Sequence, residues 1–358
     1  MSVHLIDGSE AIARSAIAAG ARFFAGYPMS PATDLLEHFS RLMPQSDGVC
    51  INVETEIESV NMAIGAAMTG FRAATGSCGQ GLALMQEAFG EAALNESPLV
   101  VFNMARSQQD YFQATRGGGW GDYRTITLAP KDVPEAVEHT QLLFHLADRY
   151  RAPVILMADN LIARTQASVS IEPRDFGELP EKDWIIDGSS SGSGRSRQVW
   201  TWGVGKHNTP GVKPEVHWTR IADKFAAVAA TEARHETGFA DDAEVLVVAY
   251  GTAAKFVEHV VRELRAEGRR IGWFRPVTLW PFPEAALIHA ARNVREILVF
   301  EINAGQMIDD VRIALGRDRP IRAIGGISTD EWGLNLGPLL DAPVLRERIE
   351  RAMAGVTA

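Results

Sequence analysis

Short apolar runs recur along the first part of the chain. They predict buried strands at residues 21–25, 49–53, 72–75, 98–104 and 152–158. Several of the intervening stretches place apolar residues at helical spacing, which indicates amphipathic helices, for example at 8–20. Helices that alternate with short apolar strands are typical of a mainly parallel sheet with both faces covered. The pattern therefore predicts an α/β fold.

The same alternation returns toward the C-terminal end, after an interruption. Strands are predicted from Ala243 and at 270–275 and 296–301, with a helix from about Pro283. No period is clear between residues 171 and 240, and the serine-glycine tract at 189–194 indicates a linker. We therefore predict three parts, which are a first α/β domain at 1–170, a linker and irregular cover at 171–240, and a smaller α/β domain at 241–358.

The helix predicted after Val53 differs from the others in its composition. Ile57, Val60, Ile64 and Ala67 recur at helical spacing and predict one apolar face. Glutamates at 54, 56 and 58 lie at its start, where the helix dipole favours negative charge. Its later part is rich in alanine and glycine, so another backbone can approach it closely. The helix is either part of a tight interface or a capped core helix with surface acids.

Composition narrows the class of protein. The chain has 358 residues, of which 46% are hydrophobic and 22% charged, as in an ordinary soluble globular protein. A net charge of −10 argues against a nucleic-acid binder. The N-terminal residues lack the cationic start and apolar core of a signal peptide, and no apolar run reaches the roughly 18 residues that span a membrane. We therefore expect a cytoplasmic protein.

Cys50 and Cys78 are the only cysteines. Two cysteines exclude a disulfide framework and suggest a reducing compartment, and they cannot hold a four-cysteine iron–sulfur cluster. Any such cluster must therefore lie on a partner. No residue near Cys78 in the sequence suggests an activating base, so a small buried residue is expected there rather than a nucleophile. The nine histidines show no metal-ligand spacing, and no metal site is predicted.

Three further features could carry chemistry. The glycine-rich turn at 76–81 follows a strand and opens a helix, so it is either a phosphate cradle or a tight turn that brings helix and strand together. Arg106 ends a buried strand, where ligands collect in open parallel sheets, which favours a carboxylate clamp over a surface arginine. The loop at 117–121, flanked by Arg116 and Arg124, either grips an anionic ligand or is a surface loop.

In combination, several motifs resemble the alpha subunit of 2-oxoacid:ferredoxin oxidoreductases, and most closely its 2-ketoisovalerate (branched-chain) type. The resemblance covers about residues 5–165 and 240–315. The motifs that carry it are Gly26-Tyr-Pro-Met-Ser-Pro31, Glu54-Thr-Glu56, Thr75-Gly-Ser-Cys-Gly-Gln-Gly81, Gln113-Ala-Thr-Arg-Gly-Gly-Gly-Trp-Gly-Asp-Tyr-Arg124, Phe274-Arg-Pro-Val-Thr-Leu-Trp-Pro-Phe-Pro283 and Glu301-Ile-Asn-Ala-Gly-Gln306.

This resemblance implies a thiamine diphosphate-binding, pyrimidine-type parallel-sheet domain, followed by a transketolase C-terminal-like α/β domain. It implies that Glu56, fourteen residues before Gly70, is the catalytic glutamate that bonds a nitrogen of the aminopyrimidine ring. A glutamate that loses water at an interface can share a proton with that nitrogen. By the same resemblance Ser30 and Arg106 bind the 2-oxoacid. The remaining cofactor-binding residues that it implies are Tyr27, Pro28, Ser77, Cys78 and Gly79.

The sequence also lacks parts of such an enzyme. No Gly-Asp-Gly motif with a downstream asparagine is present, so the diphosphate and its Mg²⁺ are expected on a separate beta subunit that shares the cofactor. Gamma and ferredoxin-like subunits are further expected partners, with coenzyme A as acyl acceptor. After Arg106 the family's glycine/proline-rich stretch is replaced by Ser107-Gln108-Gln109-Asp110. A non-oxidative decarboxylase or carboligase subunit and a catalytically silent scaffold are the alternatives.

Overall fold

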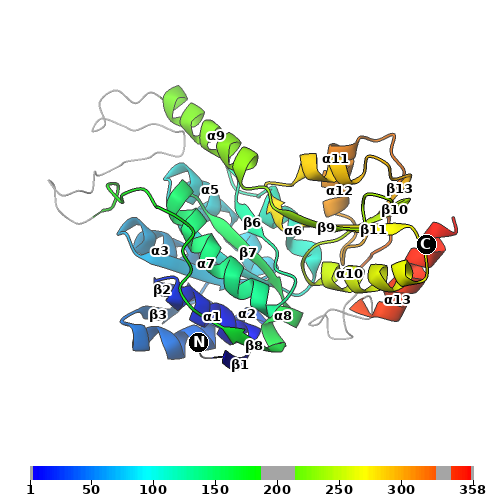
Figure 1. Cartoon of the computed structure of the whole chain (residues 1–358). Coiled ribbons are helices and arrows are strands. Elements are labelled where there is room, and N and C mark those ends of the chain that lie inside the picture. Colours follow the sequence, from blue (N-terminus) through cyan, green and yellow to red (C-terminus); the bar gives the residue numbers. More distant parts are fainter. Residues whose placement is uncertain (1–2, 187–213, 328–339, 356–358) are drawn as a thin grey trace.

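A computed structural model describes residues 3–186, 214–327 and 340–355 (Figure 1). Its described residues form two β-sheets flanked by helices, and a two-stranded ribbon of β1 (Val3–Asp7) and β8 (Gln166–Ser170). The serine-glycine tract at 189–194 lies outside the described residues. No helix in the described ranges has both the length and the apolar character needed to cross a membrane.

The first sheet has seven strands in the order β12-β6-β7-β5-β4-β2-β3. Six of them are parallel, and these are the strands that the apolar runs largely predicted. Only the edge strand β12 runs antiparallel, and it pairs with β6. The strands are β2 (Ala21–Gly26), β3 (Val49–Asn52), β4 (Arg72–Ser77), β5 (Leu99–Ala105), β6 (Ile126–Leu128), β7 (Val154–Asp159) and β12 (Thr278–Trp280).

Helices cover both faces of this sheet, as the apolar runs require because strands buried on both sides have no polar face. One face packs against α1 (Gly8–Ala18), α2 (Ala32–Leu42) and α7 (Val133–Tyr150). The other packs against α3 (Glu56–Met68), α4 (Gln80–Leu84) and α5 (Gln86–Leu94). The expected parallel-sheet fold is confirmed, and both layers of helices are visible in Figure 1.

The second sheet has five strands in the order β14-β13-β10-β11-β9. Its strands are β9 (His235–Gly238), which is antiparallel, and the parallel β10 (Val245–Val248), β11 (Ile271–Pro276), β13 (Glu296–Val299) and β14 (Ile321–Ala323). One face packs against α10 (Gly251–Ala266) and α13 (Ala342–Met353), and the other against α11 (Glu284–Ala290) and α12 (Met307–Leu315). The second α/β unit is therefore built as the pattern indicated.

The stretch 171–240, expected to be a linker with an irregular cover, contains helix α9 (Pro214–Thr231) and strand β9. Ile221 and Phe225 of α9 are buried, and the Phe225 ring lies 5.7 Å from that of Trp280. Together with the buried Val228 they lie at helical spacing, so the sequence held a signal for α9 that the prediction missed. The two boundaries between the three predicted parts stay a prediction.

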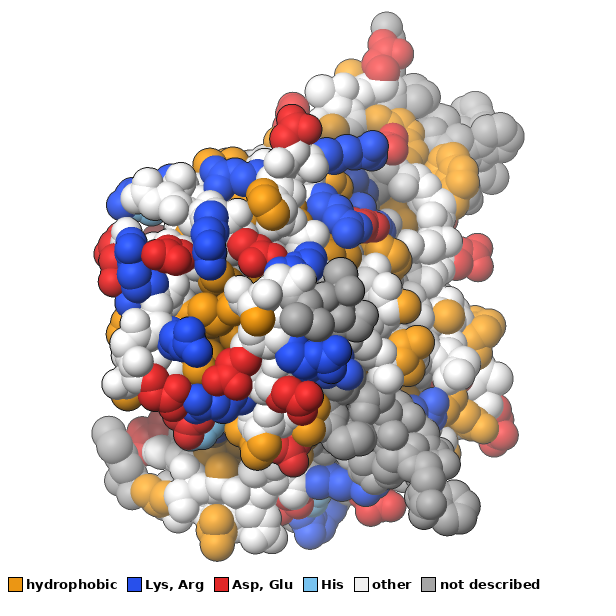
Figure 2. All heavy atoms as spheres, turned by 90° about the vertical axis from the view of Figure 1, so that its right-hand side faces the viewer, with side chains coloured by type: hydrophobic (Ala, Val, Ile, Leu, Met, Phe, Trp, Pro, Cys, Tyr) orange, Lys and Arg blue, Asp and Glu red, His pale blue; other side chains and the backbone are white. Residues whose placement is uncertain are grey.

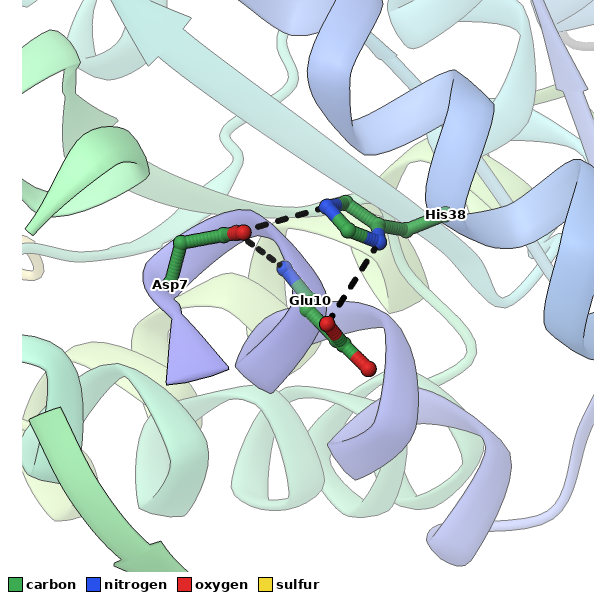
Figure 3. A group of neighbouring side chains, drawn as sticks. All are labelled: Asp7, Glu10 and His38. Atoms are coloured by element: carbon green, nitrogen blue, oxygen red, sulfur yellow. Dashed lines mark hydrogen bonds and ion pairs between the residues drawn. The ribbon is translucent and has the colours of Figure 1, made fainter. Parts of the chain in front are cut away.

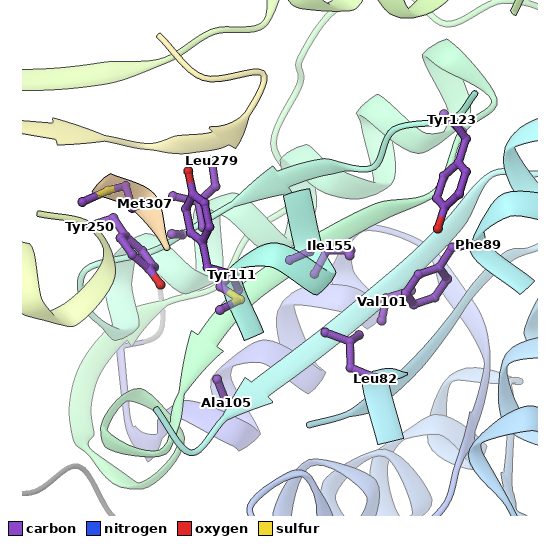
Figure 4. Close-up of a cluster of buried hydrophobic side chains, with 14 of the residues drawn as sticks. Leu82, Phe89, Val101, Ala105, Tyr111, Tyr123, Ile155, Tyr250, Leu279 and Met307 are labelled. Carbon is purple, nitrogen blue, oxygen red and sulfur yellow. The ribbon is translucent and has the colours of Figure 1, made fainter. Parts of the chain in front are cut away.

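One apolar core continues from the first sheet into the second unit. Tyr111 from α6 (Tyr111–Thr115) lies beside Tyr250, Leu279 and Met307 at one end of the cluster in Figure 4. The Tyr111 and Tyr250 ring centroids are 5.4 Å apart. At the other end of the same cluster lie Leu82, Phe89 and Val101, from the helices and strands of the first sheet.

A buried ion pair also joins the two units. Arg275 on β11 is 1% exposed and binds both carboxylate oxygens of Glu135, at 2.6 and 2.8 Å. Glu135 lies in the first turn of α7, and Glu236 on β9 is a second partner of Arg275 at 3.1 Å. The outer end of the second unit is different, because positive and negative side chains are interspersed over it (Figure 2). Exposed pairs such as Arg262–Glu258 are of this kind.

We predict that Arg275→Ala lowers the free energy of unfolding by about 3 to 5 kcal/mol, because it leaves a half-buried carboxylate without its partner. Arg262→Ala is the control, since it removes an exposed pair and should cost about 1 kcal/mol or less. Urea unfolding followed by tryptophan fluorescence measures both. Equal losses for the two variants would contradict the assigned role of Arg275.

Candidate active site

The residues expected to form a site all lie at the carboxyl ends of four adjacent parallel strands. Tyr27, Pro28 and Ser30 follow β2, and Glu56 begins α3 after β3. The turn at 77–79 follows β4, and Arg106 follows β5. Because β5, β4, β2 and β3 are neighbours in this order, their ends meet at one edge of the sheet. Ligands usually bind at that edge in open α/β sheets.

Three glutamates that look alike in the sequence have different surroundings at the start of α3. Thr55 is the N-cap, and its hydroxyl accepts the Glu58 N–H at 3.2 Å. The Glu58 carboxylate in turn accepts the Glu54 N–H at 2.9 Å, in a variant of the capping box. Glu54 and Glu58 are exposed, whereas Glu56 is 3% exposed. The carboxylate of Glu56 therefore takes no part in capping the helix, and it points into the protein.

The apolar face of α3 is placed differently from the expected one. Val60, Ala63 and Ala67 are buried, but Ile57 is 50% exposed. The helix therefore packs through its small residues, and part of its apolar surface remains uncovered within the described chain. An added Cβ at Gly65 would meet no atom within 4 Å, so the backbone is open there as well.

Ser77 holds the buried carboxylate. The Ser77 Oγ donates a hydrogen bond to Glu56 Oε1 at 3.1 Å. An added Cβ at Gly81 would lie 2.0 Å from Ser77 Oγ and 2.3 Å from Glu56 Oε1, so only glycine allows this contact. Glu56 Oε2 has no hydrogen-bond partner within the described ranges. A buried carboxylate with one oxygen free can accept an N–H group from a ligand or exchange a proton with it.

Arg106 and Ser30 are brought together, as expected, but through the backbone of Ser30. The Arg106 Nε donates to the Ser30 carbonyl at 3.0 Å, and Nη1 donates to Gln80 Oε1 at 3.1 Å. The Nη2 contacts the Met29 sulfur at 3.2 Å. A guanidinium has five N–H donors. Two therefore remain for a carboxylate, and the Ser30 side chain is exposed beside them.

Cys78 is fully buried and donates through its sulfur to the Ser30 carbonyl at 3.3 Å. Burial raises the pKa of its thiol to about 11, against the opposing effect of the Arg106 charge. Burial likewise raises the pKa of the Cys50 thiol to about 11. At neutral pH both groups are therefore neutral thiols, which is the wrong state for a nucleophile.

Asp110 is a site residue that the sequence reasoning missed. Its Oδ2 accepts the Gly79 N–H at 3.0 Å and the Asn103 Nδ2–H at 3.1 Å. Burial raises the pKa of the Asp110 carboxyl, while the bonds from Gly79 and Asn103 lower it. Gly79 has φ of +53° and forms the start of α4, so Asp110 fixes the turn that carries Cys78. An acid five residues after a strand's end was the only signal in the sequence.

The glycine-rich loop at 117–121 is packed against the first unit. Tyr123 Oη accepts the N–H groups of Gly118 and Gly119 at 3.2 and 2.9 Å. A Cβ at Gly119 would lie 2.2 Å from the Gln86 carbonyl oxygen, so the loop closes tightly on α5. Arg116 and Arg124 line a cavity of about 860 Å³ together with Trp280 and Phe282, away from Glu56. The loop is thus not part of the strand-end site.

One group in the described ranges has the spacing of a metal site, which consists of Asp7, Glu10 and His38 (Figure 3). Its contacts are explained without a metal. Asp7 is the N-cap of α1 and accepts the Glu10 N–H at 2.8 Å. Glu10 forms ion pairs with Arg14 at 2.6 Å and Arg41 at 3.5 Å. The negative charge of Glu10 is therefore already balanced by arginine.

Comparison with known families agrees with this geometry. Residues 14–184 match the model of the pyruvate flavodoxin/ferredoxin oxidoreductase thiamine diphosphate-binding domain. Residues 243–333 match pyruvate:ferredoxin oxidoreductase core domain II. These two segments carry the first sheet and most of the second.

Two curated relatives from Methanothermobacter marburgensis have similar identities. A 2-oxoglutarate synthase subunit KorA is 34% identical, and the match covers 87% of this chain and 92% of the relative. A ketoisovalerate oxidoreductase subunit VorB is 32% identical over 88% of this chain and 91% of the relative. The expected family is confirmed, but the branched-chain type is not, since both types match about equally well.

Two solved structures are also similar. A 2-oxoglutarate:ferredoxin oxidoreductase from Magnetococcus marinus, described with 2-oxoglutarate, coenzyme A and succinyl-CoA bound, matches at 26% identity and a TM-score of 0.81. The match covers 97% of this chain but only 65% of that one. A split-gene transketolase matches at 12% identity and a TM-score of 0.57, over 98% of this chain and 99% of that one, which shows the fold alone. From its two matched domains and its relatives, the chain belongs to the alpha-type subunits of the 2-oxoacid:ferredoxin oxidoreductase family.

Proposed function

We propose that the chain supplies half of a thiamine diphosphate site and the substrate clamp of an enzyme that oxidatively decarboxylates a 2-oxoacid. In this proposal the acyl group passes to coenzyme A and the electrons to ferredoxin. The observation that carries it is the buried Glu56 carboxylate, bonded on one oxygen to Ser77 and free on the other. That arrangement suits the aminopyrimidine nitrogen of the cofactor.

The residues present fit the cofactor. When bound, thiamine diphosphate supplies the carbon nucleophile and the electron sink for decarboxylation. Glu56 Oε2 would hold the proton that the ring nitrogen shares, and Ser77 would keep Oε1 from turning away. Tyr27 and Pro28, on the neighbouring loop after β2, and the turn at 77–79 would form the walls of this half of the site. The close approach at Gly81 covers the Oε1 side of the carboxylate.

Arg106 would bind the carboxylate of the 2-oxoacid with its two unused N–H donors, beside Ser30. Among the strand-end segments 27–31, 53–58, 76–81 and 106–110, Arg106 is the only lysine or arginine. A second cation would favour a dicarboxylate such as 2-oxoglutarate, whereas an apolar wall suits the side chain of a branched-chain 2-oxoacid. The charge that this chain contributes therefore favours the branched-chain substrate.

A partner would complete the site. The sequence has no diphosphate motif, so a beta subunit would hold the diphosphate and Mg²⁺. Exposed apolar side chains on α3 and in the segments after it, namely Ile57, Met62, Phe71 and Leu84, are candidates for contact with that subunit. Two neutral thiols cannot bind an iron–sulfur cluster, so electron carriers would lie on the beta subunit or a ferredoxin-like subunit.

We expect the purified complex to reduce a viologen dye when a 2-oxoacid is added, and to need coenzyme A for turnover. Comparing 2-ketoisovalerate with 2-oxoglutarate tests the substrate, and the branched-chain acid should give the higher kcat/KM. Decarboxylation without dye reduction would identify a non-oxidative enzyme. If no 2-oxoacid is turned over, the remaining interpretation is that the chain is a catalytically silent scaffold subunit.

Within that complex, Glu56→Gln should lower kcat by about 100-fold or more, because the amide cannot exchange the proton. Glu54→Gln is the matched control, since Glu54 is an exposed acid two residues away on the same helix start. Its activity should stay close to that of the unmodified chain. Equal activity of the two variants would refute the role given to Glu56.

Cys78 should resist alkylation of the native chain, because it is fully buried and carries a pKa of about 11. The partly exposed Cys50, with a similar pKa, should react slowly at pH 8, where only about one thiol in a thousand is ionised. Its rate should rise about tenfold per pH unit between pH 8 and 10. Iodoacetamide labelling read by mass spectrometry tests this, and rapid labelling of Cys78 at pH 7 would contradict it.

A further inference from the structure

Gln108 connects the substrate clamp to the second unit. Its side chain is buried. The residue makes five hydrogen bonds to the second unit, two through its side chain and three through its backbone. The side-chain Nε2 donates to the Tyr250 carbonyl at 2.9 Å, and Oε1 accepts the Ile302 N–H at 2.8 Å. The backbone N–H donates to the Ile302 carbonyl at 3.2 Å. The backbone carbonyl accepts from Asn303 Nδ2 at 2.8 Å and from the Tyr250 hydroxyl at 3.2 Å.

These partners identify the place that Gln108 occupies. Tyr250 follows β10, and Ile302 and Asn303 follow β13, the parallel neighbour of β10. The chain goes from β10 to β11 on one side of β10 and then returns to β13 on the other. The topological switch point therefore lies between β10 and β13, where open α/β sheets usually bind a ligand. In this protein Gln108 of the first unit fills that crevice.

A second common anion site of the fold is filled as well. Glu301 accepts the N–H groups of Met307 and Ile308 at 2.8 and 3.1 Å, so the N-terminus of α12 is capped by the chain itself. Gln306, just before this helix, also bonds the loop, because it accepts the Phe112 N–H at 2.8 Å and donates to the Gln109 carbonyl at 2.9 Å. The strand ends of the second unit thus bind a loop of the first.

The residues on either side of Gln108 both contact the turn at Gly79 and Gln80. Arg106, two residues before, bonds Gln80 at 3.1 Å. Asp110, two residues after, accepts the Gly79 N–H at 3.0 Å. The loop therefore grips this turn from its two ends and is fixed to the second unit at its middle. Movement at Gln108 would move both contacts and change the direction of the guanidinium.

We propose that Gln108 is a positioning residue through which the second unit holds Arg106 and the 79–80 turn in the geometry that binds the 2-oxoacid carboxylate. This inference rests on the proposed function for its substrate. The second unit then acts as a rigid support. The crevice between its strands β10 and β13 is occupied by the loop after Arg106 and not by a ligand. The replacement of a glycine- and proline-rich stretch by Ser-Gln-Gln-Asp after Arg106 is the sequence feature that makes this attachment.

The test compares Gln108→Leu with Gln109→Leu, in the full chain assembled with its beta subunit. Gln109 is exposed and bonds Gln306 only through its carbonyl, so the same substitution one residue along is the control. Gln108→Leu should raise KM for the 2-oxoacid about tenfold or more, because a displaced clamp costs binding. Its kcat should stay within about threefold, since Glu56 and Ser77 are not in the loop. Gln109→Leu should behave like the unmodified enzyme.

A second readout does not depend on activity. Hydrogen–deuterium exchange of the segment around Gly79 should be faster in Gln108→Leu than in Gln109→Leu, because the amide that Asp110 holds becomes freer. If Gln108→Leu does not assemble, Asn303→Ala can replace it, because this change removes the hydrogen bond from Asn303 Nδ2 to the Gln108 carbonyl. Its KM and its exchange rate around Gly79 are then compared with those of Gln109→Leu. Equal exchange, or a fall in kcat with unchanged KM, overturns the proposal. An unmodified complex without 2-oxoacid-dependent dye reduction overturns the proposed function instead.

Discussion

Keeping the Glu56 carboxylate out of water is the constraint on which the site depends. A buried carboxylate is costly unless hydrogen bonds and favourable charge offset the loss of hydration. The protein provides a hydroxyl from β4, the positive end of α3, and a glycine that lets the second strand-to-helix turn close over the pair. The glutamate follows β3, whereas the hydroxyl and the glycine lie at the end of β4, so these two strand ends have to come together before the pair can form.

The two units use the same kind of edge in opposite ways. In the first, the ends of four parallel strands carry a buried acid and a guanidinium with two unused N–H donors. In the second, the corresponding edge is filled by a loop from the first, and its helix N-terminus is capped from within. The first edge is the one to which we assign the site, whereas the second attaches the two units to each other. The two units therefore use the carboxyl ends of their parallel strands in different ways.

Much of this arrangement could be predicted from local sequence. Apolar runs indicated most strands of both sheets, and the local pattern drew attention to the acids at 54–58, but only the family resemblance selected Glu56 among them. The sequence could not show that Thr55 and Glu58 take up the capping, which is what leaves Glu56 free. The role assigned to the loop after Arg106 also escaped prediction, because Gln108 and Asp110 act on residues brought near only by the fold. Helix α9 was missed although Ile221, Phe225 and Val228 recur at helical spacing, because the prolines and glycines just before it made the whole stretch resemble a linker.

The antiparallel strand β12 has a consequence for the integrity of the chain. It belongs in sequence to the second unit, yet it pairs with β6 and closes one edge of the first sheet. A gene fission that separated the two halves upstream of Thr278 would leave β6 with a row of unpaired backbone groups, and bare edges of this kind recruit foreign strands. The first sheet is thus completed by a strand from the second unit. A first unit expressed without that strand would tend to self-associate rather than stay monomeric.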